Sequence, residues 1–196
     1  MSEQGKLPLY ILAGGRSSRF GSDKARMVIE GKPILKVIEE VLKPYCLSTT
    51  VIAEEKGKYE DLGLRTIADD KDGYCGPLMG VLTAANDMKR VHGSGWFMLV
   101  SCDVVGMDHR WIKRLVEGRL KEGGAVVFYD DRYQPFPGLY HSVGAACAEE
   151  MLRDGRSSMQ QFLAEIDAVK VDVPHDWGLM IQVNTPEDYQ RIQRKK

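Results

Sequence analysis

Short apolar runs alternate with longer amphipathic segments along most of this 196-residue chain. Continuous apolar runs bounded by polar turns are typical of strands that are covered on both faces of a sheet. They predict strands at residues 9–12, 50–53, 64–68, 96–100, 125–129 and 169–173, with a short extended piece at 27–29. Helical spacing of apolar residues predicts helices at 33–42, 77–90, 111–121, 144–153 and 159–166, and Thr185 is expected to cap a last helix.

This order of strands and helices predicts an α/β fold. Strands that alternate with helices form parallel sheets, because right-handed crossovers return the chain to the same edge. We expect one Rossmann-like domain over residues 1–196, with a mostly parallel sheet and helices on both faces. The segment Asp130–Gly138, "DDRYQPFPG", breaks the alternation and is expected to be an irregular functional loop.

Composition narrows the classes of partner. Lys and Arg total 27 against 28 Asp and Glu, so the net charge of −1 gives no global attraction to nucleic acid or to an anionic membrane. No apolar run approaches the ~20 residues that span a bilayer, and "MSEQGKLPLY" lacks the apolar core of a signal peptide. The four cysteines are scattered without a CxxC pair, which is typical of reduced thiols. We therefore expect a cytoplasmic protein.

A glycine-rich loop with cations follows the first predicted strand, in "YILAGGRSSRFGSDKA", Tyr10 to Ala25. Gly14 and Gly15 let backbone N–H groups approach an anion closely. Arg19 can grip phosphate oxygens as a planar fork, and Lys24 can add a point charge. The combination suits a polyphosphate, although neither GxxxxGK[ST] nor GxGxxG is present. A flexible turn with solvated cations remains the alternative.

Carboxylates follow two other predicted strands, and ligands of open α/β sheets bind beyond the carboxyl ends of the strands. Asp103 comes after the strand at 96–100, where it is either a ligand for Mg²⁺ or a turn aspartate. Asp69, Asp70 and Asp72 follow the strand at 64–68. We expect one of them to bind a ribose hydroxyl or the ion, and the other two to be surface residues.

The helix start at Gly76 and Pro77 is a further candidate. Its glycine would let a base or a ribose lie against the backbone, but an ordinary helix start uses the same residues. The four histidines show no catalytic spacing, and no GxSxG elbow is present.

At this point the motifs resemble a known family. "LAGGRSSRFGSDKA" is similar to the signature LAGG-x-S-x-R-M-G-x-D-K of the molybdenum cofactor guanylyltransferases, which are nucleotide-diphospho-sugar-transferase-like nucleotidyltransferases. Four more stretches recur in the family's order: the Asp69 loop leading into "GPLMG", "CD" at Asp103, "QPFPGLY" from Gln134, and "NTPED" from Asn184. The resemblance extends from about Leu9 to Tyr189.

The resemblance implies an activity and a set of site residues. The family joins GMP from GTP to the terminal phosphate of molybdopterin with Mg²⁺, and releases pyrophosphate. By matching motifs, the catalytic residues would be Arg19 and Lys24 on the triphosphate and Asp103 on Mg²⁺. The remaining nucleotide contacts would come from Leu12, Ala13, Gly14, Gly15, Asp69, Gly76 and Pro77, and the acceptor side from Gln134 and Asn184. A molybdopterin-delivery protein and a cofactor-insertion protein are the implied partners.

The chain departs from the family pattern at a few positions. Val105 replaces a proline, Gln182 replaces an asparagine, Phe20 replaces a methionine, and Ile52–Glu55 stands where relatives carry Asn-x-Asn-Arg. Molybdopterin cytidylyltransferases are the nearest competing family, but they read LAAG and lack the "GPLMG" helix start. A small-molecule nucleotidyltransferase acting on a phosphosugar or a 2-phospholactate-type substrate is also compatible with the motifs, as is a non-catalytic GTP-binding adaptor.

Overall fold

The structure is a computed structural model that describes residues 5–14, 23–29, 31–69, 76–107, 109–119, 123–173, 175 and 181–182. The strands are β1 (Leu7–Leu12), β2 (Val28–Ile29), β3 (Lys32–Pro33), β4 (Cys46–Ala53), β5 (Arg65–Ala68), β6 (Trp96–Ser101), β7 (Val104–Val105), β8 (Ala125–Asp130), β9 (Arg132–His141), β10 (Val169–Asp172) and β11 (Ile181–Gln182). The α-helices are α1 (Ile34–Leu42), α2 (Pro77–His92), α3 (His109–Gly118), α4 (Ala145–Arg153) and α5 (Met159–Glu165). Short 3-10 helices are η2 (Lys24–Arg26), η3 (Lys43–Tyr45), η4 (Glu60–Leu62) and η5 (Ser142–Gly144).

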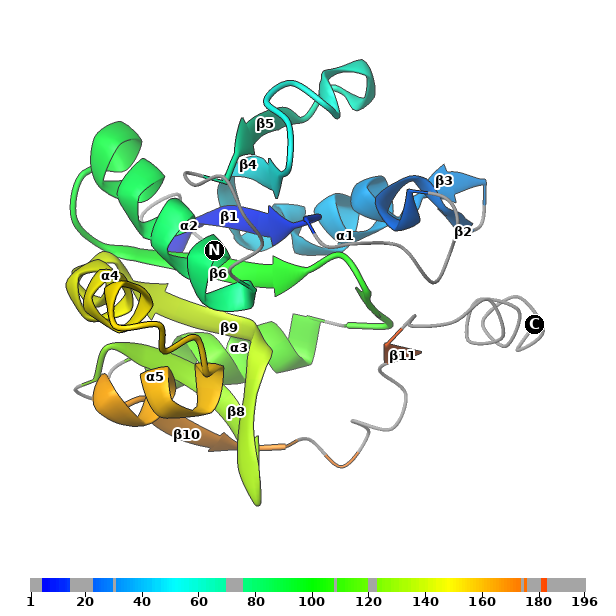
Figure 1. Ribbon diagram of the computed structural model, residues 1–196. Helices are drawn as coiled ribbons and strands as arrows, with labels where there is room; N and C mark the ends of the chain where they lie inside the picture. Colours follow the sequence, from blue (N-terminus) through cyan, green and yellow to red (C-terminus); the bar gives the residue numbers. More distant parts are fainter. Residues whose placement is uncertain are drawn as a thin grey trace.

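A seven-stranded sheet in the order β10-β8-β9-β6-β1-β4-β5 forms the centre of the molecule (Figure 1). Four neighbouring pairs are parallel, β1 with β4, β1 with β6, β4 with β5, and β8 with β10. Only β9 runs antiparallel, against both β6 and β8. The predicted α/β fold with a mostly parallel sheet is confirmed.

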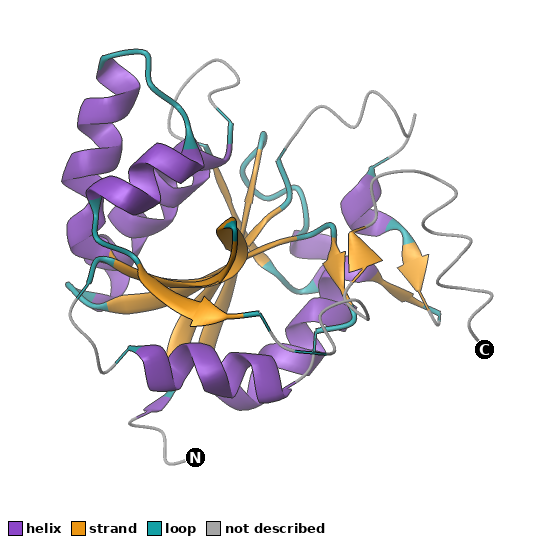
Figure 2. Ribbon diagram, turned by 90° about the horizontal axis from the view of Figure 1, so that it is seen from below, coloured by secondary structure: helices purple, strands orange, loops and turns teal. Residues whose placement is uncertain are grey.

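Helices cover both faces of this sheet (Figure 2), as predicted. Because side chains alternate along a strand, β1 contributes to two separate cores. Leu9 and Ile11 pack in the core that α1 and α3 cover, whereas Tyr10 and Leu12 pack in the core that α2, α4 and α5 cover. This double coverage explains the continuous apolar run, since both faces of β1 are buried.

The prediction of an irregular loop at Asp130–Gly138 is wrong. These residues form the end of β8 and most of β9, which pairs on both of its sides. Pro135 and Pro137 made the segment look irregular, because a proline cannot donate to a sheet ladder. Both lie where the pairing of β8 with β9 is interrupted, between Val127 and Phe128. The predicted last helix at Thr185 lies outside the described residues.

Two further findings bear on the expectations from composition. Cys46, Cys102 and Cys147 are free thiols, and Cys75 lies outside the described residues. In the part of the chain that the structure describes, no helix has both the length and the apolar character needed to cross a bilayer.

Candidate active site

The site lies where the order of the sheet reverses. From β1 the chain continues to β4 and β5 on one side, and then returns to place β6 on the other side of β1. Such switch points leave a crevice beyond the carboxyl ends of parallel strands. Leu12 ends β1 and Ser101 ends β6, and the two residues are paired in the sheet. The crevice therefore lies beyond the carboxyl ends of the neighbouring strands β1 and β6.

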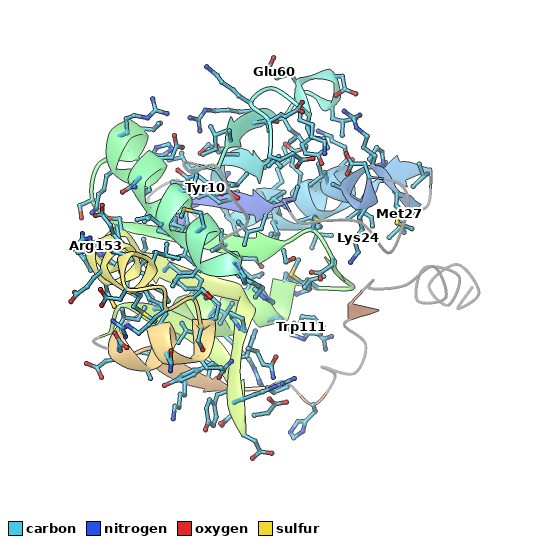
Figure 3. The ribbon with its side chains drawn as sticks, viewed as in Figure 1. Tyr10, Lys24, Met27, Glu60, Trp111 and Arg153 are labelled. Carbon is cyan, nitrogen blue, oxygen red and sulfur yellow. The ribbon has the colours of Figure 1, made fainter. Side chains whose placement is uncertain are left out.

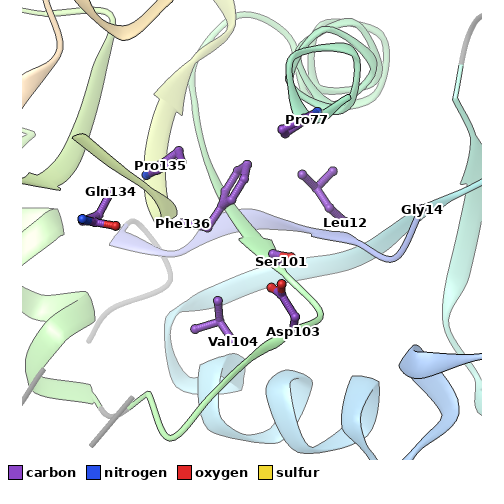
Figure 4. Close-up of a pocket in the computed structure, with 9 residues that line it drawn as sticks. All are labelled: Leu12, Gly14, Pro77, Ser101, Asp103, Val104, Gln134, Pro135 and Phe136. Atoms are coloured by element: carbon purple, nitrogen blue, oxygen red, sulfur yellow. The ribbon is translucent and has the colours of Figure 1, made fainter. Parts of the chain in front are cut away.

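A pocket of about 290 Å³ occupies this crevice (Figure 4). Its lining combines strand ends, a helix start and part of β9: Leu12, Gly14, Pro77, Ser101, Asp103, Val104, Gln134, Pro135 and Phe136. Five of the residues expected at the site, Leu12, Gly14, Pro77, Asp103 and Gln134, are thus brought together although they are far apart in the sequence. The shared pocket supports a common role for them.

Asp103, which lines the pocket, is paired with the opposite charge of Lys24. The Lys24 ammonium Nζ lies 3.9 Å from Oδ2 of Asp103, and the two side chains are 16% and 26% exposed. Asp103 follows β6, and Lys24, which is labelled in Figure 3, begins η2. Partial shielding from water strengthens the effect of such charges on a bound ligand. The pair can interact with an anionic ligand through Lys24 and with a cation through Asp103.

Asp23 holds the turn that carries Lys24. Its carboxylate accepts hydrogen bonds from the backbone N–H of Ala25 at 3.0 Å and from the Tyr59 hydroxyl at 3.0 Å. The Lys58 ammonium lies 3.2 Å from the same carboxylate. Neighbouring Arg26 forms two hydrogen bonds to the Asp61 carboxylate, at 2.7 and 2.9 Å. Lys58, Tyr59 and Asp61 carry no sequence signal for this role, because they are remote from the glycine loop in sequence.

Asp69 lies on the β4–β5 side of the crevice. Thr83 of α2 donates a hydrogen bond to its Oδ1 at 3.2 Å, and its backbone N–H bonds the carbonyl of Ala53 at 3.0 Å. A methyl group added to Gly14 would lie 3.6 Å from Asp69 Oδ2, so the carboxylate packs directly against that glycine. Ala13 is held beside them by a hydrogen bond from its N–H to Ile52. The expected proximity of Asp69 to the glycine loop is therefore present in the fold.

The amino-terminal end of α2 faces the pocket through Pro77. Gly76, the residue before this helix, has a φ of +72° that a residue with a side chain rarely adopts. Free N–H groups at a helix start favour an anion. The position of Gly76 and Pro77 thus fits both an ordinary helix start and a helix start that binds a ligand.

Gln134 lines the opposite wall from within β9. Its side-chain amide donates to Oδ1 of Asp130 at 2.6 Å. Three expected site residues, Gly15, Arg19 and Asn184, lie outside the described residues. Within the described part of the chain, no three His, Cys, Asp or Glu side chains come together as a metal site. Asp103 accordingly offers a single carboxylate to a cation.

Comparison with known proteins agrees with the motifs. The family model of the MobA-like NTP transferase domain matches residues 9–169. The molybdenum cofactor guanylyltransferase of Yersinia pestis (strain Pestoides F) is 30% identical over 189 residues, which are 95% of this chain and 94% of that protein. A relative with the same name from Yersinia pseudotuberculosis serotype O:1b matches at the same identity and coverage.

Solved structures show the same fold. Molybdopterin-guanine dinucleotide biosynthesis protein A from Archaeoglobus fulgidus superposes with a TM-score of 0.79 at 20% identity, covering 96% of this chain and 98% of that one. The 4-diphosphocytidyl-2C-methyl-D-erythritol synthase of Anaerococcus prevotii superposes with a TM-score of 0.73 at 12% identity, covering 97% of this chain and 98% of that one. With the sequence matches, these findings confirm the resemblance, and the chain belongs to the MobA-like NTP transferase family of nucleotidyltransferases.

Proposed function

We propose that the protein transfers GMP from GTP to the terminal phosphate of molybdopterin, which forms molybdopterin guanine dinucleotide and releases pyrophosphate. The observation that carries the proposal is the ion pair between Lys24 and Asp103, where Asp103 lines a pocket together with Gly14 and the start of α2. The name shared by the Yersinia relatives supports guanylyl transfer in particular. We further propose that residues 1–196 form one nucleotidyltransferase domain.

In this reaction an oxygen of the acceptor phosphate attacks the α-phosphorus of GTP. The bond from that phosphorus to the bridging oxygen breaks, and its electrons leave with pyrophosphate. Such transfers depend mainly on positioning and on neutralising charge. A phosphate monoester is already largely ionised near pH 7, so the chain need not supply a general base. None of the described histidines lines the pocket.

Different residues would contact the triphosphate, the nucleoside and the acceptor. Lys24 and Arg19 would neutralise the triphosphate, and the backbone of Leu12, Ala13, Gly14 and Gly15 would contact guanine and ribose. Asp69, Gly76 and Pro77 would complete the nucleotide side, whereas Gln134 and Asn184 would serve the acceptor side. This assignment is supported by the common pocket of Leu12, Gly14, Pro77, Asp103 and Gln134.

Asp103 fits a role in holding Mg²⁺. Mg²⁺ in nucleotide sites is bound by one or two carboxylates together with phosphate oxygens and water, and Asp103 presents one carboxylate to the pocket. When bound, the ion would neutralise phosphate charge during transfer. Lys24 then acts beside it by holding a second positive charge near the same phosphates.

We also propose a cellular location and partner proteins for the reaction. Free Cys46, Cys102 and Cys147 are consistent with a cytoplasmic location, where thiols stay reduced. A molybdopterin-delivery protein and a cofactor-insertion protein would be its partners, because acceptor and product must be handed over.

A thermal-shift titration with GTP, CTP, ATP and UTP, each with and without Mg²⁺, tests the nucleotide choice. A ligand that binds only the folded state stabilises it by RT ln(1 + [L]/Kd), so selectivity is measured as a ranked shift. We expect the largest Mg²⁺-dependent shift with GTP, followed by pyrophosphate release once molybdopterin is added. A larger shift with CTP would indicate cytidylyl transfer, and GTP binding without pyrophosphate release would indicate an adaptor.

A further inference from the structure

Three residues of β9 bulge out of the sheet at the pocket. Val127 of β8 pairs with Gly138, but the next residue, Phe128, pairs with Gln134, so Pro135, Phe136 and Pro137 have no partner in β8. Two of these three, Pro135 and Phe136, line the pocket next to Gln134. Bulges near active sites redirect side chains, and this one brings an aromatic ring to the wall (Figure 4).

Hydrogen bonds hold the bulge in place. The buried Tyr140 hydroxyl donates to the carbonyl of Pro135 at 2.8 Å. The Gln160 side chain accepts from the N–H of Tyr133 at 3.0 Å and donates to its carbonyl at 2.8 Å, as a neighbouring strand would. Gly138 closes the bulge, since a methyl group there would lie 2.8 Å from the Pro135 carbonyl oxygen. These contacts fix the backbone of the bulge.

The sheet order indicates which substrate this wall faces. Gly14 and Asp69 belong to the ends of β1 and β5, whereas the bulge belongs to β9 on the far side of β6. Asp103, which follows β6, lies between these two sides. The acceptor oxygen attacks the α-phosphorus on the side opposite the leaving pyrophosphate, so the acceptor needs a part of the crevice that the nucleotide does not fill. With the nucleotide on the side of Gly14 and Asp69, the β9 side is left for the acceptor.

The chemistry of Phe136 suits a flat ring better than a phosphate. Its half-buried side chain packs on the core beneath α2, α4 and α5 and also contributes to the pocket wall. Aromatic faces bind planar rings by offset stacking or edge-to-face contact. They do not neutralise a phosphate, a task for which Lys24 is already present.

We propose that the bulge Pro135–Pro137 is the acceptor wall of the site and that Phe136 stacks on the planar pterin ring of the acceptor. This inference rests on the proposed function and identifies Phe136 as a specificity-determining residue. Tyr140 is a positioning residue, since it bonds the carbonyl of Pro135 in the bulge, and Gln160 supports it by holding the backbone of Tyr133, two residues before the bulge.

Phe136→Leu and Phe136→Tyr test the stacking. Molybdopterin binding and GTP binding are each followed by calorimetry. We expect Phe136→Leu to weaken molybdopterin binding roughly tenfold with an unchanged GTP Kd. Phe136→Tyr, which keeps the ring, should restore binding. An unchanged molybdopterin affinity in Phe136→Leu, or a weakened GTP affinity instead, would overturn the acceptor wall.

Tyr140→Phe and Tyr129→Phe form a matched pair for the positioning role. Both hydroxyls donate to a backbone carbonyl of the same hairpin, but Tyr129 donates to Asp131 at the exposed tip, at 3.2 Å. We expect Tyr140→Phe to raise the KM for molybdopterin about fivefold without changing the KM for GTP. Tyr129→Phe should change neither. Equal effects of both variants, or an equal rise in both KM values, would refute the positioning role.

The inference and the proposed function fail in different ways. Wild-type protein that binds GTP and molybdopterin but releases no pyrophosphate would refute guanylyl transfer, while the effect of Phe136→Leu on binding would still decide the acceptor wall. Wild-type protein that transfers GMP, with no loss of molybdopterin affinity in Phe136→Leu, would refute the wall alone. Wild-type protein that does not bind molybdopterin would refute both.

Discussion

The hydroxyl of Tyr59 donates a hydrogen bond to the Asp23 carboxylate, with 3.0 Å between the oxygen atoms. Asp23 immediately precedes Lys24, the cation at the candidate active site. Tyr59 is fully buried, and its ring lies 5.1 Å from the Arg26 guanidinium on the same turn. A residue remote from the glycine loop in sequence therefore fixes the turn that presents Lys24.

Tyr59→Phe should lower turnover while the protein stays folded. Without the hydroxyl, the Asp23 turn is held less firmly, and a displacement of about 1 Å near reacting groups can cost up to ~10²-fold in rate. We expect kcat to fall roughly tenfold and the free energy of unfolding to fall by about 1 kcal/mol. Pyrophosphate release under saturating substrates and urea denaturation measure the two effects.

Tyr45→Phe is the matched control. The Tyr45 hydroxyl donates a hydrogen bond to the His109 carbonyl at 3.4 Å on the exposed surface. Its removal should therefore leave both kcat and the free energy of unfolding at wild-type values. Full turnover in Tyr59→Phe would show that the hydrogen bond from Tyr59 to Asp23 does not position Lys24.

Lys24→Ala should abolish most turnover without unfolding the protein. In the proposed reaction Lys24 would neutralise charge that develops on the phosphates, and loss of one such group costs on the order of 10²–10³ in kcat. The measurement is single-turnover pyrophosphate release, with a thermal unfolding curve to confirm folding. Lys113→Ala removes a 72% exposed lysine from α3 and should leave the rate unchanged. Near-normal turnover in Lys24→Ala would rule out its catalytic role.

Asp87 makes stability depend on pH in acid. This nearly buried residue of α2 accepts hydrogen bonds from the Tyr10 hydroxyl at 3.0 Å and from Arg65 at 2.7 Å to each oxygen. Burial alone would raise the pKa of the carboxyl, but hydrogen bonds from Arg65, Arg90 and Tyr10 outweigh it and lower the pKa to about 2. In the unfolded chain an aspartate has a pKa near ~3.9. The folded protein therefore favours the ionised form of Asp87 more than the unfolded chain does.

Asp87→Asn should reduce the free energy of unfolding by about 2 kcal/mol at pH 7. Because the folded pKa is depressed, this contribution is fully present above about pH 4 and is lost as the pH falls toward 2. Urea denaturation at pH 7 and pH 3 should therefore show a smaller difference between variant and wild type at pH 3. Asp154→Asn, at a half-exposed ion pair with Arg156, should change stability by less than ~1 kcal/mol at either pH. A difference for Asp87→Asn that is equal at both pH values would contradict this account.

Gly138→Ala should displace the β9 bulge. The added methyl group would lie 2.8 Å from the Pro135 carbonyl oxygen and 2.9 Å from Val127 Cγ1, which is too close for atoms in a packed sheet. We expect a loss of about 1–3 kcal/mol in the free energy of unfolding and a higher KM for the acceptor.

Gly144→Ala is the control for this substitution. Gly144 has a helical φ of −63°, and a methyl group there would meet the Phe162 ring at an ordinary distance of 3.6 Å. It should leave activity unchanged and stabilise the protein by about 0.4–1 kcal/mol. If Gly138→Ala behaves in the same way, the bulge is not sterically fixed.

Much of the fold could be predicted because its signals are local. The apolar run ending at Leu12 marked a strand covered on both faces, and helices at 77–90 and 159–166 were confirmed with small shifts of their ends. Asp103 and Gly14 were placed at strand ends by the same reasoning, and both line the pocket. β9 was missed because its prolines hide a strand whose pairing is interrupted only at the bulge.

By itself, the sequence determined most of the segments that form strands and helices, although not β9, and it determined the family. These depend on periodicity and on motifs whose residues are close together in the chain. Only the tertiary structure decided that β9 runs antiparallel beside β6, that Phe136 reaches the pocket, and that Tyr59 holds Asp23. Each of these depends on contacts between residues far apart in sequence, which form only when the sheet order brings their strands and loops together.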